Sequence, residues 1–307
     1  MKMYITILLI LLSIISLSIG IGDIDNDVFL HSRVPRLVAL LLSGAGLALA
    51  GTIMQQLSRN RFSSPSIMGV NDCTMLGLCI ALLFFSSSDL WICVCIGFAF
   101  AVLGMLLVTK ILDVVVIKDP LFIPLIGIMF GKVIQAVYMY IVYKYNLLQD
   151  LQTWMLGDFS TMVTGRYELL YLIIPVVGFA YLYSMQLTMI GLGEGMVTSV
   201  GINYDKIKYI GIIIVSIISS ATILICGHLP FLGLIVPNLV NIFHGANIKK
   251  NMFYILSYGA LITVLCDTVG RYARYPFEVP ISLILGILGS VVFILLILRG
   301  DKYGRQN

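Results

Sequence analysis

Ten apolar runs follow one another along this chain, and most of them are close to 20 residues long. The hydrocarbon core of a bilayer is about 30 Å thick, so a helix needs about 20 apolar residues to cross it. The pattern therefore predicts an all-α integral membrane protein with about ten transmembrane helices, in a single transmembrane domain that covers residues 1–307. The runs cover residues 3–22, 36–57, 67–86, 90–110, 121–143, 168–186, 207–227, 231–243, 252–269 and 281–299.

Composition excludes an ordinary soluble protein. Hydrophobic residues make up 60% of the chain and charged residues only 11%, whereas soluble domains carry about 25% charged residues. The first run follows Lys2 and resembles a signal peptide, but no cleavage site with small residues follows it. We therefore expect the first run to be kept as a membrane helix.

Lysine and arginine concentrate in alternate loops. If both termini are cytoplasmic, 12 of the 19 basic residues lie inside, as the positive-inside rule expects. These are Lys2, Arg59, Arg61, Lys110, Lys118, Lys206, Lys208, Lys249, Lys250, Arg299, Lys302 and Arg305. Arginines on the opposite side call for another explanation, and they are Arg33, Arg36, Arg166, Arg271 and Arg274.

Two segments depart from a simple spanning helix. The run 231–243 is short, follows Pro230 and contains Pro237, so it predicts a broken or partial span. Residues 187–206 are too polar to span and are interrupted by glycines, so they predict two short amphipathic turns. Glycines and alanines between residues 44 and 51 predict close packing of that helix against its neighbours.

Recognised catalytic and metal-binding motifs are absent from the sequence. No HExxH, GxSxG or zinc-spaced cluster occurs, and all six cysteines lie in apolar runs. A stretch from Gly127 to Lys132 resembles a phosphate loop, but it is one residue too short and lies inside a predicted membrane helix. We therefore predict a protein that is not an enzyme, with no cofactor and no metal site. Active transport would need an ion gradient or a partner ATPase.

Four stretches interrupt the apolar pattern with polar residues and glycine. They are H-S-R-V-P-R at 31–36; G-T-I-M-Q at 51–55 with R-N-R-F-S-S-P at 59–65; G-L-G-E-G at 191–195 leading to V-G at 200–201; and F-L-G-L-I-V-P-N at 231–238 with D-T-V-G-R at 267–271 and E-V-P at 278–280. In order and spacing, over nearly the whole chain, they resemble the FecCD-type iron-siderophore and cobalamin permeases of ABC importers. The resemblance implies the type II importer permease fold in a bacterial plasma membrane.

Two further strings bear on the cargo. W-M-L-G-D-F-S at 154–160 and G-R-Y-E-L-L-Y at 165–171 are most similar to the branch that handles catecholate-type ferric siderophores, petrobactin-like ones included. A heme or cobalamin permease of the same fold stays open as an alternative. An ion-coupled secondary transporter is a further alternative, although it would normally carry acidic residues within its spans.

The resemblance also implies roles for individual residues. Arg33, Arg36 and Arg271 match outward arginines that dock a substrate-binding protein through its carboxylates, which suits the bidentate guanidinium. A role as interfacial anchors is the alternative for these arginines.

Residues at the predicted inner end match two further functional elements of the family, the coupling element and the inner mouth of the pathway. The segment 188–206 matches the element that couples the permease to its ATPase, with Gly193, Glu194, Gly195 and Gly201 as its marker residues, although Glu194 would also suit a helix start. Gln55, Asn60 and Pro65 match the inner mouth of the pathway.

Lys132 stands out without any resemblance, because it is a charge about midway along a predicted span. Intramembrane charges cost about 2.5–3.5 kcal/mol on insertion scales and usually face a cavity or a partner. Lys132 would line the pathway and attract an anionic chelate, or it would snorkel or pair with a neighbouring subunit.

The resemblance finally implies an assembly. The expected partners are a second permease subunit, identical or similar, two ATP-binding-cassette ATPases inside, one substrate-binding protein outside, and membrane lipid. No feature of the sequence points to nucleic acid.

Overall fold

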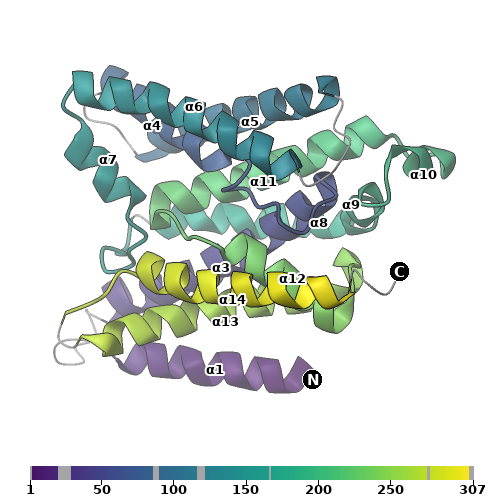
Figure 1. The fold of residues 1–307 in the computed structure, drawn as a ribbon. Coiled ribbons are helices and arrows are strands. Elements are labelled where there is room, and N and C mark those ends of the chain that lie inside the picture. Colours follow the sequence, from purple (N-terminus) through teal and green to yellow (C-terminus); the bar gives the residue numbers. More distant parts are fainter. Residues whose placement is uncertain are drawn as a thin grey trace.

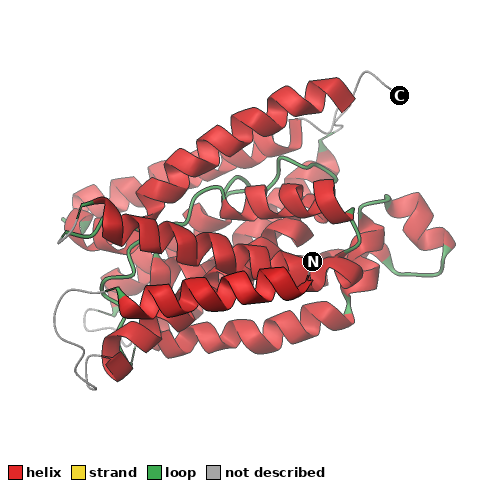
Figure 2. Cartoon of the chain, turned by 90° about the horizontal axis from the view of Figure 1, so that it is seen from below, coloured by secondary structure: helices red, strands yellow, loops and turns green. Residues whose placement is uncertain are grey.

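A computed structural model describes residues 2–19, 29–85, 90–115, 122–165, 167–274 and 277–303, so Lys118, Arg166 and Arg305 lie outside the described residues. Every regular element in this part of the chain is helical (Figure 2). The elements are α1 (Lys2–Ser18), the π-helical turn η1 (Phe29–Arg33), α3 (Val34–Leu57), α4 (Val70–Phe84), α5 (Leu90–Val114), α6 (Phe122–Lys144), α7 (Leu148–Met155), the 3₁₀ turn η2 (Tyr167–Leu172), α8 (Ile173–Leu182), α9 (Ser184–Ile190), α10 (Glu194–Ser199), α11 (Tyr204–Cys226), α12 (Leu232–His244), α13 (Ile248–Ala273) and α14 (Ile281–Tyr303).

The helices reproduce the ten apolar runs. Five are long and apolar enough to cross a membrane, namely α3 together with η1, α5, α6, α11 and α13. The pair formed by η2–α8 and α9 is a sixth candidate span, bent by 69°. Four shorter apolar helices, α1, α4, α12 and the part of α14 up to Leu295, complete the set. The all-helical membrane architecture expected from the sequence is thereby confirmed.

Helix α3 lies at the centre of the bundle and packs against α11, α12 and α13 (Figure 1). Its glycines make this possible, because a β-carbon at Gly51 would overlap the carbonyl of Gly233 on α12. A β-carbon at Gly44 would similarly collide with the Gly259 backbone of α13. The small residues of this run therefore allow backbone-to-backbone packing, as the sequence predicts.

The irregular segments form short helices, and one predicted span, the run 168–186, is broken. Helix α12 is a short helix that contains Pro237 and begins after Phe231, which has a left-handed backbone (φ 61°). The run 168–186 was expected to be one helix, but the chain bends after Tyr183 and continues as α9 to Ile190. A turn and the six-residue helix α10 then follow, and α10 projects from the bundle (Figures 1 and 2).

The ends of the bundle differ in what they carry. Helix α1 begins, and α14 ends, at the same end of the bundle as the projecting α10 (Figure 1). Helix α7, the end of α13 and the start of α14 lie at the opposite end (Figure 1). Below, the end with α10 is called the coupling end and the opposite end the docking end.

Candidate docking, pathway and coupling sites

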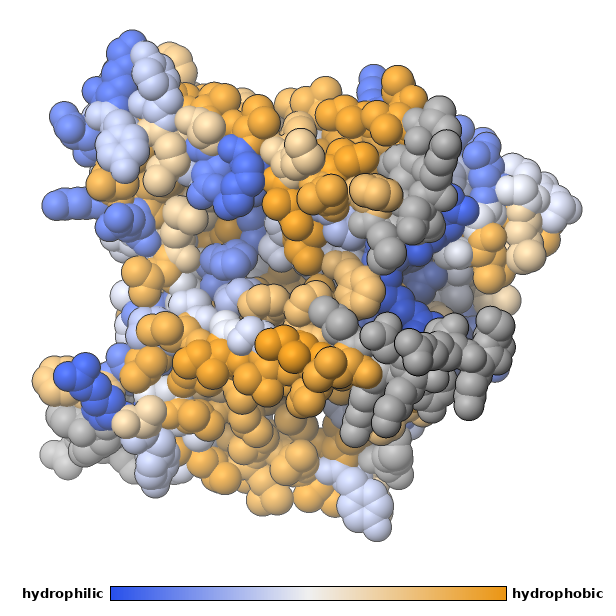
Figure 3. Space-filling model, in the orientation of Figure 1, coloured by the Kyte–Doolittle hydropathy of each residue, from blue (hydrophilic) through white to orange (hydrophobic). Residues whose placement is uncertain are grey.

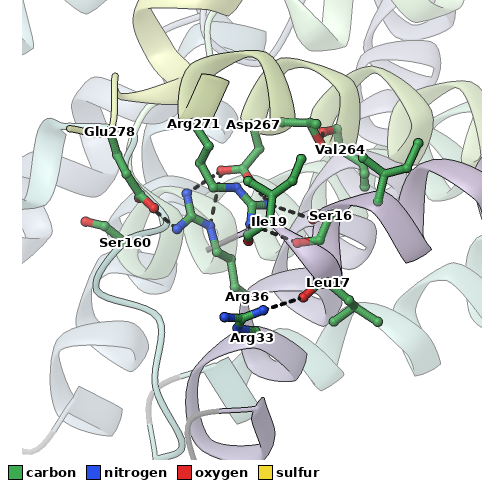
Figure 4. A network of polar contacts seen from close by, with 12 residues as sticks. Ser16, Leu17, Ile19, Arg33, Arg36, Ser160, Val264, Asp267, Arg271 and Glu278 are labelled. Carbon is green, nitrogen blue, oxygen red and sulfur yellow. Dashed lines mark hydrogen bonds and ion pairs between the residues drawn. The ribbon is translucent and has the colours of Figure 1, made fainter. Parts of the chain in front are cut away.

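A buried cluster of charges lies at the docking end (Figure 4). Arg36, in the first turn of α3, donates from Nη2 to Asp267 Oδ1 at 2.8 Å and from Nη1 to Glu278 Oε2 at 2.8 Å. Arg271 donates to the other oxygen of the same carboxylate, Asp267 Oδ2, at 2.6 Å. Asp267 is only 3% exposed, so one buried carboxylate bridges two guanidinium groups.

The same cluster holds the end of α1. Arg271 donates to the carbonyls of Ser16 and Ile19, both at 2.8 Å, and Arg33 donates to the carbonyl of Leu17 at 2.9 Å (Figure 4). The last carbonyls of a helix have no partner within it and favour cations. Two arginines therefore cap α1 and tie it to α3 and α13.

The three arginines of this cluster are those that, by resemblance to the family, are expected to dock a substrate-binding protein. Arg33 is 8% exposed and Arg271 is 6% exposed, and each has partners within the chain. The side chain of Arg36 is 13% exposed, and its partner Glu278 is 26% exposed, so this pair comes closest to the surface. Docking through these residues stays a prediction, and the structure brings all three together at one end.

Asp267 and Glu278 were not predicted from the sequence as partners of the arginines. A signal for one contact was present, because Asp267 and Arg271 are four residues apart and so lie on the same face of α13. The contact between Arg36 and Asp267 joins residues 231 positions apart. A contact between residues so far apart in the sequence cannot be predicted from the local sequence pattern.

The expected inner-mouth residues gather around the link between α3 and α4. Gln55 Nε2 donates to the carbonyl of Arg61 at 2.8 Å, and Asn238 Nδ2 on α12 donates to the same carbonyl at 2.9 Å. Asn60 Oδ1 accepts from the backbone of Phe62 at 2.8 Å. The amide side chains therefore fix this loop against α12, and Pro65 lies buried within the same loop.

Lys132 lies elsewhere, on a cavity between α4, α6 and the start of α12. The cavity has a volume of about 390 Å³. Its polar wall residues are Ser64, Ser66, Asn71, Asp72, Lys132, Gln135 and His228. Figure 3 shows this face of the molecule hollowed between α6 and α14, with hydrophilic residues in the hollow and hydrophobic ridges on either side.

Three phenylalanines lie close together beside this cavity, and the sequence analysis did not identify them. Phe231 lines the cavity and lies 6.3 Å, ring to ring, from Phe293 on α14. Phe62 meets Phe293 edge-on at 5.8 Å. A β-carbon at Gly289 would overlap Phe231, so the glycine makes room for a residue whose left-handed backbone is unusual outside glycine.

The expected coupling segment forms the projecting element at the opposite end. Gly193 (φ 100°) and Gly201 (φ 80°) flank α10 in conformations that favour glycine. Glu194 begins the helix, and a side chain at Gly195 would meet open space. Three apolar side chains of this element are exposed, namely Met196 within α10 and Leu192 and Val200 on either side of the helix.

Comparison with known proteins identifies the family of this chain. Residues 3–299 match the family model described as the FecCD transport family. The chain belongs to the FecCD transport family. It is 42% identical over 98% of both chains to the petrobactin import system permease protein YclN of Bacillus subtilis, and 38% identical, over 96% of this chain and 90% of the other, to the petrobactin import system permease protein FatD of Bacillus anthracis.

The fold agrees as well. A solved metal-chelate type ABC transporter in an inward-facing conformation matches with a TM-score of 0.84 at 25% identity, over 97% of this chain and 98% of the other. The chain is thus an ABC importer permease subunit of the FecCD family with the corresponding membrane fold. Members of this family are transmembrane subunits that catalyse no reaction themselves.

Proposed function

We propose that this chain is the permease subunit through which an ABC importer moves a ferric siderophore of the petrobactin type into the cytoplasm. The observation that carries the cargo assignment is the 42% identity to a petrobactin permease along 98% of both chains. Identity to the vitamin B12 import permease BtuC of Vibrio cholerae is lower, at 29% over 91% of this chain. A ferric siderophore is therefore favoured over cobalamin.

The polar hollow between α6 and α14 supports a second permease subunit. Lysine, carboxylate and amide groups in a membrane span are costly in contact with lipid and are tolerated where protein or water covers them. The cavity beside Lys132 opens on this hollowed face. A second permease subunit, identical or similar, would cover the face and enclose one pathway at the interface.

The projecting α10 supports a contact with the ATPases. The exposed apolar side chains of Leu192, Met196 and Val200, in α10 and at its two ends, would be unfavourable in water if they stayed uncovered. Each of two ATPase subunits would receive one such element, so that closure of the ATPases rocks the permease helices. Under this proposal the coupling end, with both chain termini, faces the cytoplasm, in the plasma membrane of a bacterium.

The docking end supports a contact with an extracytoplasmic substrate-binding protein. A carboxylate of that protein would reach the guanidinium of Arg36 on the side now occupied by Glu278, since this pair is the more exposed part of the cluster. Arg33 and Arg271 would not touch the binding protein themselves but would hold α1 and α13 in place beneath the docking surface.

Reconstitution tests the proposed function. Proteoliposomes that contain the permease, the ATPase and the binding protein should take up ferric petrobactin only with internal ATP, and cobalamin uptake serves as the cargo control. A Walker-lysine variant of the ATPase should abolish uptake. Uptake by the permease alone in an ion gradient would contradict the importer mechanism, and preferred uptake of cobalamin would contradict the cargo.

A further inference from the structure

The cavity between α4 and α6 carries two charges of opposite sign at membrane depth. Lys132 is the eleventh residue of α6, and Asp72 lies in the first turn of α4. Both line the cavity of about 390 Å³. We propose that this cavity is a transient binding station for the cargo, and that it recognises a chelate that carries anionic oxygens and a protonated amine. This inference rests on the proposed function and specifies the chemistry of its cargo.

The α6 wall is suited to the anionic part of such a chelate. Lys132 is exposed, and its Nζ donates to Gln135 Oε1 at 2.7 Å. Because this bond uses the amide oxygen, Gln135 keeps the two N–H donors of its NH₂ group, which also interacts with Tyr138, and a ligand can accept from them. The wall therefore presents a cation together with an N–H donor, and anionic oxygens form their strongest hydrogen bonds with such groups.

The α4 wall is suited to a cation. Asp72 is half-buried and lies against α6, since a β-carbon at Gly131 would be 2.6 Å from its Oδ2. Within the described residues, the ion pairs shorter than 4 Å involve Arg36, Lys208 and Arg271, and Asp72 takes part in none of them. A carboxylate at this depth favours a cationic partner. The two opposite charges thus share one cavity without closing on each other.

The shape of the site agrees with passage of a cargo. A second, shallower hollow of about 510 Å³ shares Met155, His228 and Pro230 with the cavity and extends to Gln152 and Leu283 near the docking end. The cavity volume lies within the range of about 300–1,000 Å³ that is usual for small-molecule sites.

Aromatic rings lie beside the cavity on the side of the loop after α3. Phe231 belongs to its wall, and Phe293 and Phe62 pack in sequence behind Phe231. A cargo that enters from the docking end would therefore stop beside Lys132 and Asp72 until these rings move apart. The polar groups would hold the chelate during this interval.

A simpler role for Asp72 would be to hold Lys132 in place by attraction, without touching the cargo. The two roles differ in what they predict for two ligands. Two synthetic ferric tris-catecholate chelates serve as probes, one of which carries an aminoalkyl arm and one of which does not. Binding of each radioiron-labelled chelate is measured to the permease–ATPase complex in nanodiscs, without nucleotide or binding protein.

The binding station predicts a crossed pattern. Lys132→Gln should weaken binding of both chelates by about tenfold, as expected for loss of a charge-assisted contact. Asp72→Asn should weaken binding of the amine-bearing chelate by about tenfold and change the other by less than about twofold. Equal weakening of both chelates by Asp72→Asn, or no effect of Lys132→Gln, would overturn the proposal.

Matched variants show that the effects belong to the cavity. Lys144→Gln removes a charge at the C-terminal end of α6, where Lys144 lies over the Tyr145 ring. Asp113→Asn removes a carboxylate that pairs with Lys208 at 2.7 Å. Neither should change binding of either chelate, and a comparable loss in these variants would contradict the assignment. Lys132→Arg should retain binding, and all variants should assemble with the ATPase.

The outcome is separable from that of the proposed function. If wild-type complexes import ferric petrobactin with ATP but bind neither synthetic chelate, the binding station is wrong and the importer function stands. If the complete wild-type system imports no ferric siderophore, the proposed function itself fails.

Discussion

Replacement of Asp267 by alanine should destabilise the permease more than almost any other single loss of charge. The Asp267 carboxylate is 3% exposed and joins Arg36 at 2.8 Å and Arg271 at 2.6 Å. Its removal would leave two buried guanidinium groups without their shared counter-charge. Breaking a buried ion pair in this way costs about 3–5 kcal/mol.

This cost can be converted to a melting temperature. A chain of this size loses about 2 °C of melting temperature for each kcal/mol, so Asp267→Ala should lower it by about 6–10 °C. A thiol-reactive dye can report unfolding in detergent, because Cys73, Cys226 and Cys266 are buried in the native chain. Their labelling should begin at the lower temperature in the variant.

The control for this measurement is the exposed ion pair at Asp113. Asp113 is 56% exposed, and its pair with Lys208 should contribute less than about 1 kcal/mol. Asp113→Asn should therefore shift the melting temperature by less than about 2 °C. If Asp267→Ala shifts it by no more than this control, the buried cluster does not hold the helix ends together, and the reasoning is wrong.

Three further predictions test the docking end, the packing and the coupling element. Glu278→Gln should tighten docking of the substrate-binding protein by about threefold to tenfold, because it frees one side of the guanidinium for an incoming carboxylate; unchanged affinity by titration would refute this. Gly51→Ala should prevent stable folding, since its β-carbon would overlap the carbonyl of Gly233, whereas Gly178→Ala meets no atom within 4 Å and should leave the melting temperature unchanged or raised. Gly193→Ala should preserve docking but uncouple ATP hydrolysis from uptake, because its φ of 100° costs a side chain about 1–3 kcal/mol; normal uptake per ATP would contradict the coupling assignment.

The sequence predicts those features that depend on local pattern. The apolar runs identify the helices, because all ten runs have a counterpart among the described helices, six as candidate spans and four as shorter apolar helices. Pro237 and the short run around it predict the irregular helix α12. The glycines of α3 predict close packing, although not the partners, which are Gly233 and Gly259.

Features that depend on distant contacts could not be predicted in the same way. The bend after Tyr183 occurs in an apolar stretch without proline or glycine at the break, so no local residue marks it. The packing of Phe62 against Phe293 depends on how α14 crosses the loop after α3. Such contacts are fixed by the packing of the whole bundle.

Charge balance connects the fold to the proposed transport. At the docking end, Arg36 and Arg271 meet Asp267 and Glu278, so two positive charges are matched by two negative ones within the chain. Such buried ion pairs are costly to break from one side, so these partners hold one another in place.

The pathway shows the opposite arrangement. Lys132 has an amide partner, Gln135, and shares its cavity with Asp72 without an ion pair shorter than 4 Å within the described residues. A charge that is matched inside the chain stabilises one conformation, because any movement separates it from its partner. A charge that is left incompletely matched in a cavity can instead be satisfied by a molecule that arrives and leaves. Lys132, near the middle of α6, and Asp72, which lines the same cavity, are therefore the best place in this chain to look for contact with the cargo.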